Sequence, residues 1–89
     1  MKNYGIRVYG KVQGVFFRAN ALRVATDNGI TGWVKNEADG SVSISAEGRE
    51  HQLQQLLKWC EKGPAYASVS KVDCLEKELG NFKSFRIIH

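Results

Sequence analysis

The apolar residues of this chain follow two spacings in turn, and the order of these spacings restricts the possible folds more than any other feature. A spacing of two is typical of a half-buried strand, whereas a spacing of three and four is typical of one face of a helix. In chain order, the spacings predict a strand over residues 3–10, a helix from about residue 17 to the Asn28-Gly29 pair, strands over 30–37 and 41–47, a helix over 50–62, and strand-like segments over 67–79 and 82–88. This order predicts an α+β fold of the split βαβ kind, in which an antiparallel sheet carries two helices on one face.

Turn-forming residues lie where this order requires them. Asp39-Gly40 separates two alternating segments and is a strong hairpin signal. Gly29 and the Gly63-Pro64 pair follow the two helical segments, where glycine adopts the left-handed conformation at low cost. The second strand of the hairpin shows the clearest alternation, with the side chains expected to point inward at Val42, Ile44 and Ala46 and outward at Ser41, Ser43 and Ser45.

Length and composition exclude several classes of protein. The longest apolar run covers only residues 15–17, so no segment is suited to span a membrane. The first residues lack the apolar stretch of a secretory leader, and we therefore expect a cytoplasmic protein. The length suits one domain over residues 1–89. Thirteen Lys and Arg residues against nine Asp and Glu give a net charge of +4, which favours an anionic partner.

The cysteines and histidines do not form a metal site in the sequence. Cys60, Cys74, His51 and His89 have no metal-ligand spacing, so we expect no metal. Cys60 lies on the apolar stripe of the second helical segment and Cys74 in a strand-like segment, and both are predicted to be buried structural thiols. A cytoplasmic location also argues against a disulfide between them.

The predicted topology itself indicates where a ligand would bind. The strands over residues 3–10 and 30–37 would run parallel with the third strand between them, so their carboxyl ends lie at the same edge of the sheet. The first of these ends leads to Arg18 and the second to Asn36. Two strand spacings separate the two ends by roughly 9–10 Å. The two side chains can therefore converge on one small ligand.

The segment from Gly10 to Arg18 is a glycine-containing turn that leads into a helix. The main-chain N–H groups of Gln13 to Arg18 could bind an anion as a nest at the helix N-terminus, and the Arg18 guanidinium would add a fork for phosphate oxygens. The alternative is a plain turn with a solvated arginine, because a glycine pair near a helix start is common.

The segment from Gly32 to Gly40 offers one residue that packing does not explain. Trp33 and Val34 fit the packing of a strand, and Asp39-Gly40 fits a turn. Asparagine is disfavoured within strands. Asn36 therefore either lies at the end of the strand for reasons of turn geometry or contributes its side-chain amide to a site. Both interpretations stay open at this point.

Two motifs together resemble the acylphosphatase family. The first covers residues 8–18, Val-Tyr-Gly-Lys-Val-Gln-Gly-Val-Phe-Phe-Arg, and the second lies within residues 29–40 and has the core Gly-Trp-Val-x-Asn-x-x-Asp-Gly. Gly63-Pro64 and Phe85-Arg86-Ile87 are also similar to the family, so the resemblance spans essentially the whole chain. It implies a ferredoxin-like α/β sandwich, which agrees with the order of elements derived above.

The resemblance implies an enzyme that hydrolyses acyl phosphates to a carboxylate and inorganic phosphate. Arg18 matches the substrate-binding arginine of the family, and Asn36 matches the asparagine that positions the attacking water. Main-chain amides would hold the phosphoryl oxygens at Gln13, Gly14, Val15, Phe16, Phe17 and Arg18. The family implies neither metal nor cofactor, and we expect a monomer for which inorganic phosphate or sulfate competes with the substrate.

One residue departs from the pattern that we associate with many family members. Glu37 follows Asn36 where a hydroxyl residue is common. Strand alternation should turn Glu37 toward the opposite face of the sheet from Asn36, whereas a carboxylate facing the phosphate would weaken binding. Lys11 and Lys35 near the expected site could offset that charge.

Two other classes of protein fit the same fold. An RNA-recognition module would stack bases on aromatic side chains of the two central strands. Tyr9 is a candidate, but the other central strand offers only serines, and Phe16 and Phe17 are expected to pack inside; we therefore expect no nucleic-acid partner. A catalytically silent module that binds a small effector is the third hypothesis, and no residue of the sequence indicates it.

Overall fold

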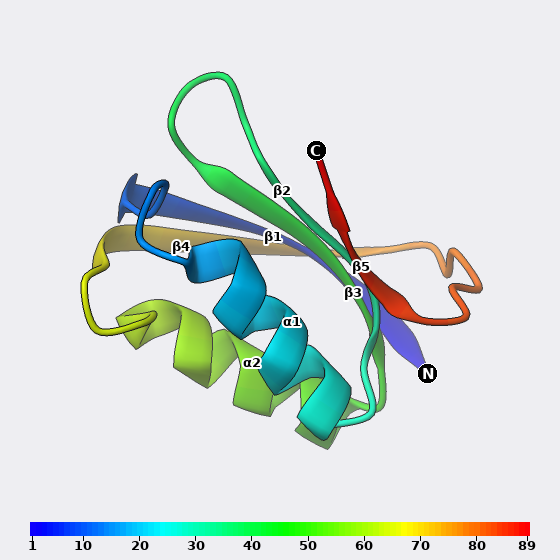
Figure 1. Cartoon of the computed structure of the whole chain (residues 1–89). Helices are drawn as coiled ribbons and strands as arrows, with labels where there is room; N and C mark the ends of the chain where they lie inside the picture. Colours follow the sequence, from blue (N-terminus) through cyan, green and yellow to red (C-terminus); the bar gives the residue numbers. More distant parts are fainter.

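The computed structural model describes residues 1–89 and has two helices packed on one face of a five-stranded sheet (Figure 1). Its elements are β1 (Lys2–Lys11), α1 (Phe17–Asp27), β2 (Thr31–Asn36), β3 (Val42–Gly48), α2 (Glu50–Lys62), β4 (Ser68–Lys77) and β5 (Phe85–Ile88). The predicted order of strands and helices is confirmed. Neither helix is long and apolar enough to cross a membrane.

The strands lie in the order β4-β1-β3-β2-β5. β3 pairs antiparallel with both β1 and β2, and β4 pairs antiparallel with β1. β5 pairs parallel with β2, so the sheet expected to be antiparallel is mixed at this one edge. β1 and β2 run in the same direction on either side of β3, as the sequence predicted.

The core lies between the sheet and the helices because the apolar stripes of both kinds of element face each other. Ile6, Ile44 and Val34 are buried and lie in register across β1, β3 and β2. Helix α2 packs on β1 and β3 and contributes Leu53 and Leu56, which are fully buried, whereas α1 packs on β2. The stripes predicted from the sequence are therefore the ones that form the core.

Phe17 joins the two helices. Its ring lies 4.9 Å from that of Trp59, measured between centroids, with a tilted arrangement. Aromatic pairs favour such a geometry and contribute about 0.5–1.5 kcal/mol beyond the area that they bury. This contact fixes the N-terminal end of α1 over the core.

The serines of β3 were expected to be exposed on the outer face of a half-buried strand, but the structure buries them. Every residue of β3 is buried, including Ser43 and Ser45. The Ser45 hydroxyl contacts the Asn3 side chain, and the Ser43 hydroxyl donates to the Glu37 carboxylate. A central strand has a neighbour on each side, and long side chains from these neighbours cover the small serines.

The two cysteines are both free thiols but lie in different environments. Cys60 is buried, as predicted, and burial raises the pKa of its thiol to about 12. Cys74 is exposed, so the prediction of a buried thiol is wrong for this residue. The physical reason is that β4 is an edge strand, which only one strand and one helix cover.

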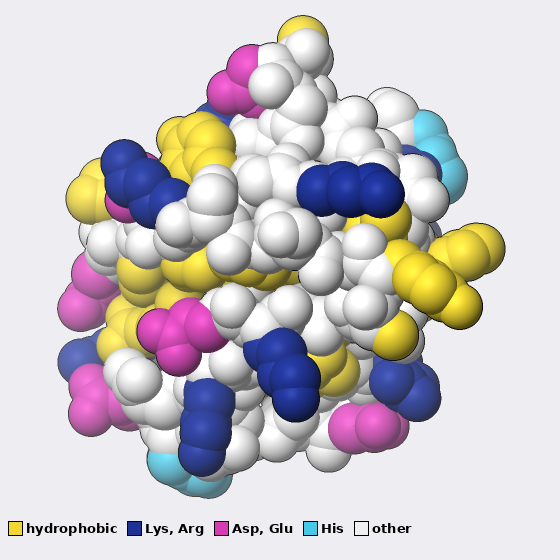
Figure 2. Space-filling model, turned by 90° about the vertical axis from the view of Figure 1, so that its left-hand side faces the viewer, with side chains coloured by type: hydrophobic (Ala, Val, Ile, Leu, Met, Phe, Trp, Pro, Cys, Tyr) yellow, Lys and Arg dark blue, Asp and Glu magenta, His cyan; other side chains and the backbone are white.

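Charged side chains of both signs are spread over one face of the molecule. On the face shown in Figure 2, Lys and Arg side chains are separated from one another and interspersed with Asp and Glu. A continuous basic stripe of the kind that follows a nucleic-acid backbone is absent from this face.

Candidate active site

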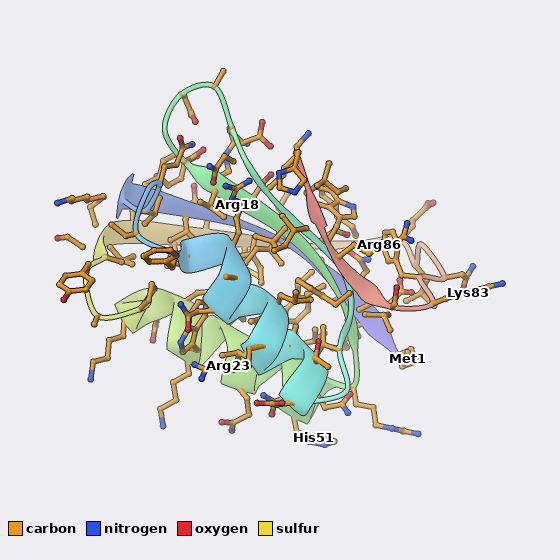
Figure 3. All side chains as sticks on the ribbon, in the orientation of Figure 1. Met1, Arg18, Arg23, His51, Lys83 and Arg86 are labelled. Atoms are coloured by element: carbon orange, nitrogen blue, oxygen red, sulfur yellow. The ribbon has the colours of Figure 1, made fainter.

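Arg18 and Asn36 line the same cavity, which has a volume of about 270 Å³. Arg18 lies in the first turn of α1, and Asn36 is the last residue of β2. The cavity opens at the edge of the sheet where β1 and β2 end, as the topology predicted. Figure 3 shows Arg18 at the N-terminal end of α1, whereas Arg23 lies farther along this helix and His51 lies at the opposite end of the helical layer.

Asn36, which lines this cavity, has a hydrogen-bond acceptor that no other group of the protein uses. Its Oδ1 atom is buried and has no hydrogen-bond partner within the protein, and it is the only buried side-chain polar atom in that condition. Buried polar atoms are nearly always paired, so an exception needs an explanation. An oxygen in this position can accept a hydrogen bond from a water molecule or from a ligand.

The Arg18 guanidinium is also largely uncommitted. No carboxylate lies within salt-bridge distance of it. Its one side-chain contact is between Nη1 and Nδ1 of His89, at 3.4 Å. A guanidinium without a protein anion beside it is suited to bind an anionic ligand in a bidentate manner.

The loop between β1 and α1 has the backbone geometry of an anion-binding nest. Gly14 has φ +74° and Phe16 has φ +64°, whereas Val15 between them has a negative φ. Such alternation turns successive N–H groups toward one point. None of the N–H groups from Gln13 to Arg18 donates a hydrogen bond to another main-chain group. No side chain caps α1, and its first turn has no acidic residue, so the positive end of the helix dipole is free.

The loop is placed by the strand that precedes it. Gly10 has φ +122° at a bulge between β1 and β4. A Cβ atom at this position would lie 2.2 Å from the main-chain oxygen of Ser68, so only glycine fits. The bulge shifts the register of the pairing, which continues to Lys11, where β1 ends and the chain turns toward α1.

Gln13 has a role that the sequence analysis did not find. Its Nε2 atom donates to the main-chain oxygens of Glu37, at 2.8 Å, and Ser41, at 2.9 Å. The side chain thus ties the loop to the β2–β3 hairpin immediately after Asn36. The sequence analysis considered only the main-chain amide of Gln13, and no local pattern shows which distant carbonyl groups a glutamine will contact.

Glu37 faces away from the cavity, which confirms the prediction from strand alternation. Its carboxylate accepts a hydrogen bond from the Ser43 hydroxyl, and Lys35 Nζ lies 3.7 Å from it. The hydrogen bond from Ser43 and the nearby Lys35 charge lower the pKa of the Glu37 carboxyl. Neither Glu37 nor Lys35 lines the cavity, and Lys11 does not line it either.

The prediction that the Phe16 side chain packs inside the protein is wrong. The side chain expected to pack inside is 74% exposed, whereas Phe17 is 2% exposed and in the core. Val15 and Phe17 both point inward, and the left-handed backbone between them turns the Phe16 ring outward. For a residue with a Cβ atom this conformation costs about 1–2 kcal/mol.

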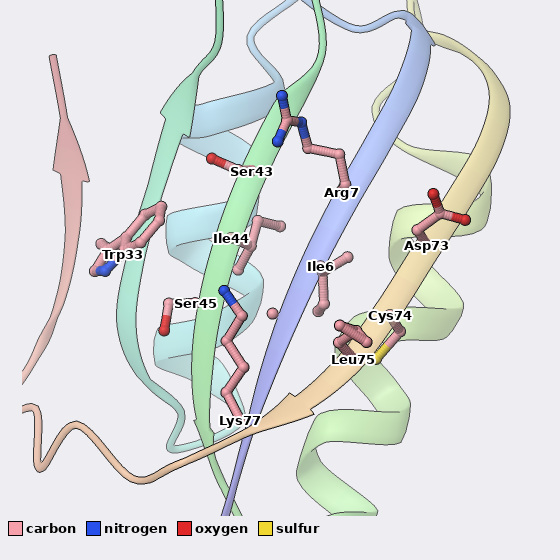
Figure 4. A pocket seen from close by; sticks show the side chains of 11 residues that line it. Ile6, Arg7, Trp33, Ser43, Ile44, Ser45, Asp73, Cys74, Leu75 and Lys77 are labelled. Carbon is pink, nitrogen blue, oxygen red and sulfur yellow. The ribbon is translucent and has the colours of Figure 1, made fainter.

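A second hollow lies on the face of the sheet that the helices leave open. It has a volume of about 500 Å³, and Trp33, Ser45 and Lys77 are among its lining residues (Figure 4). Neither Arg18 nor Asn36 lines it. The serines of β3 form part of its floor, so this face lacks the paired aromatic platform that the RNA-recognition hypothesis requires.

Comparison with known proteins identifies the family. The acylphosphatase family model matches residues 4–87. The chain belongs to the acylphosphatase family. An acylphosphatase of Methylococcus capsulatus is 43% identical over 89 residues, which cover 99% of this chain and 97% of that protein.

Solved acylphosphatase structures have the same fold. The crystal structure of acylphosphatase from Bacillus subtilis superposes with a TM-score of 0.97 at 37% identity, with both chains covered in full. An acylphosphatase from Coxiella burnetii gives a TM-score of 0.95 at 37% identity over 98% of this chain and 92% of that one. These similarities confirm the resemblance, the ferredoxin-like α+β fold and the enzyme class that the motifs implied.

Proposed function

We propose that this chain hydrolyses acyl phosphates to a carboxylate and inorganic phosphate, with the site formed by Arg18, Asn36 and the loop amides of Gln13 to Arg18. The observation that carries the proposal is the buried, unpartnered Oδ1 of Asn36, a residue that lines the same cavity as Arg18. Membership of the acylphosphatase family supports the reaction, and the geometry supports these residues as its machinery.

The loop amides and Arg18 bind the phosphoryl group. The N–H groups of residues 13–18 have no other main-chain acceptor, and the guanidinium has no competing carboxylate. Phosphoryl transfer passes through a loose transition state whose charge is spread over three equatorial oxygens. Donors that are fixed before the substrate arrives stabilise this charge without reorganising, which is the largest single contribution in many enzymes.

Asn36 positions the attacking water. Its Oδ1 accepts a hydrogen bond from the water and leaves a lone pair of the water oxygen directed at phosphorus. An amide oxygen is a poor base, so the water keeps its protons until the new oxygen–phosphorus bond has largely formed. Holding the water in line contributes by proximity and orientation rather than by proton abstraction.

The leaving group needs no acid. The bond from phosphorus to the acyl oxygen breaks with its electron pair on the carboxylate, which is the conjugate base of a fairly strong acid. The water oxygen becomes part of inorganic phosphate, and the released proton passes to solvent. The cavity is lined by no Asp, Glu or Cys side chain, and its one histidine, His89, has no step in the proposed reaction.

The proposed reaction requires no second chain and no metal. We expect a monomer to be the active form. No three His, Cys, Asp or Glu side chains are grouped so that they could hold a metal ion. A cytoplasmic location and the organisation as one domain over residues 1–89 stay predictions.

The test is hydrolysis of benzoyl phosphate in the presence of EDTA. We expect turnover by the unmodified protein, and Arg18→Gln should lower kcat/KM by about 10²–10³-fold. Arg23→Gln is the matched control, because Arg23 lies on the same helix, is exposed and does not line the cavity. Full activity of Arg18→Gln would place the site elsewhere, and complete loss of activity with EDTA would indicate a metal-dependent hydrolase.

A further inference from the structure

Phe16 presents an apolar ring at the mouth of the proposed active site. Its side chain is 74% exposed, and it lines the cavity that Arg18 and Asn36 also line. Single exposed apolar side chains are ordinary on protein surfaces, so the position of this ring beside the cavity, rather than its exposure, is the observation that points to a role. Phe16 is part of the loop that would bind phosphate, so the ring has a fixed position relative to the reacting group.

The loop does not need this ring to adopt its conformation. Phe16 is one of only two residues other than glycine with a positive φ. Glycine would adopt the same conformation without strain, as Gly14 does two residues earlier. Strained residues of this kind cluster at functional sites, where the surrounding structure holds them.

Neighbouring contacts hold the strained residue in place. The main-chain oxygen of Phe16 accepts hydrogen bonds from the main-chain N–H of Asn20, at 3.1 Å, and from Nδ2 of the same residue, at 2.8 Å. Val15 and Phe17 on either side are buried in the core. The ring therefore stays exposed at the mouth of the cavity because both of its neighbours are anchored inside.

The remaining surface of the cavity is suited to an apolar group. When Arg18, Asn36 and the loop amides hold the phosphate and the water, the side chains left to contact the acyl part are mainly Val12, Phe16, Ala19 and Ile87, with His89 at the edge beside Arg18. No acidic side chain lines the cavity, so an acyl group bearing an ammonium group would find no partner.

We propose that Phe16 is a specificity-determining residue, whose ring forms the apolar wall against which the acyl group of the substrate packs. This inference rests on the proposed function. The site then favours acyl phosphates with an aromatic or branched aliphatic acyl group over those with a small or polar one. Contact with the acyl group would stabilise the larger substrate both when it is bound and in the transition state, because the acyl group is still at the site when its bond to phosphorus breaks.

The experiment compares benzoyl phosphate with acetyl phosphate. We expect Phe16→Gly to lower the ratio of their kcat/KM values by about 5–20-fold, within the range seen when an apolar contact is removed from a pocket. Because Phe16 also belongs to the phosphate-binding loop, both substrates can lose activity, and the loss should be larger for benzoyl phosphate than for acetyl phosphate. Phe16→Leu, which keeps an apolar side chain and the strained backbone, should retain an intermediate ratio.

A matched control and a binding measurement separate this role from a structural one. Leu75→Ala removes an exposed apolar side chain from β4, which does not line this cavity, and should leave the ratio unchanged. Phenylphosphonate and methylphosphonate are unreactive competitors, and Phe16→Gly should weaken inhibition by phenylphosphonate more than inhibition by methylphosphonate. The same ratio in Phe16→Gly as in the unmodified protein, or an equal loss with both substrates, would overturn the inference.

The outcomes also distinguish this inference from the proposed function. An unmodified protein that hydrolyses neither substrate overturns both. An active protein in which Arg18→Gln abolishes turnover but Phe16→Gly keeps the substrate ratio overturns only the role of Phe16.

Discussion

The Nε2 atom of Gln13 lies 2.8 Å from the main-chain oxygen of Glu37, the residue that follows Asn36. This hydrogen bond connects the loop before α1 with the end of β2, two segments that meet only in the folded chain. In the proposed mechanism one segment holds the phosphoryl group and the other holds the water. Gln13 thus sets the distance between the two reactants.

Replacing Gln13 should therefore affect both activity and stability. Gln13→Ala removes two hydrogen bonds, although each acceptor keeps a main-chain donor, Gly40 N–H for the Glu37 oxygen and Glu37 N–H for the Ser41 oxygen. The loss of the two bonds should lower the free energy of unfolding by about 1–3 kcal/mol. Misplacement of the loop should lower kcat/KM for benzoyl phosphate by about 10-fold or more. Urea denaturation and steady-state kinetics measure the two effects. Gln54→Ala, an exposed position on α2, is the control, and equal behaviour of the two variants would exclude the positioning role.

Asn36→Ala should separate catalysis from folding. If Asn36 only orients water, kcat should fall by about 10²–10³-fold, while inhibition by sulfate stays within about twofold of the unmodified value, because the anion site is intact. The melting temperature should stay the same or rise, because the substitution removes a buried acceptor that has no partner. A clear fall in melting temperature with unchanged kcat would assign Asn36 a structural role instead.

Sulfate should bind the loop and compete with the substrate. The free N–H groups of Gln13 to Arg18 predict that their amide NMR resonances shift on titration with sulfate. In Arg18→Gln, the same shifts should require a sulfate concentration that is higher by about tenfold or more, because a charge-assisted bidentate contact is lost. Shifts confined to other basic parts of the surface, with none in this loop, would contradict the nest.

Glu37→Gln should leave catalysis nearly unchanged. The carboxylate contacts Ser43 and Lys35 on the face of the sheet away from Asn36. We expect kcat/KM for benzoyl phosphate within about twofold of the unmodified protein, since the charge is partly neutralised and lies outside the cavity. A large rise in activity would mean that the Glu37 charge opposes the phosphate after all.

Glu47 should make the fold sensitive to acid. Burial by itself would raise the pKa of this carboxyl, but hydrogen bonds from the main-chain N–H groups of Gly80 and Phe82 and from the Asn3 side chain outweigh it and lower the pKa. Because the pKa is lower in the folded state, the ionised carboxylate stabilises the fold above pH 4.5, the ordinary pKa of this group. This stabilisation is lost as the pH falls below that value. Urea midpoints of Glu47→Gln should be lower than those of the unmodified protein at pH 7, and the two should converge toward pH 3. Parallel curves over the whole range would contradict this account.

The sequence alone determined the order of the elements and the edge of the sheet at which the candidate site lies. Apolar spacing and turn residues such as Gly29 and Asp39-Gly40 act within a few residues, so they can be read without knowledge of distant contacts. The helix over 50–62 was predicted to the residue, and the parallel directions of β1 and β2 followed from the order of strands. The motifs around Arg18 and Asn36 were sufficient to indicate the family, because they combine such local geometry with the residues of the candidate site.

Only the tertiary structure decided which side chains are covered and which are free. Phe16 is exposed because both of its neighbours point into the core, and Cys74 is exposed because β4 lies at the edge of the sheet. Ser43 and Ser45 are buried because strands on both sides of β3 cover them, and Gln13 reaches carbonyl groups in another hairpin. Each of these outcomes depends on segments that are distant along the chain, and burial and pairing are properties of that packing rather than of local sequence.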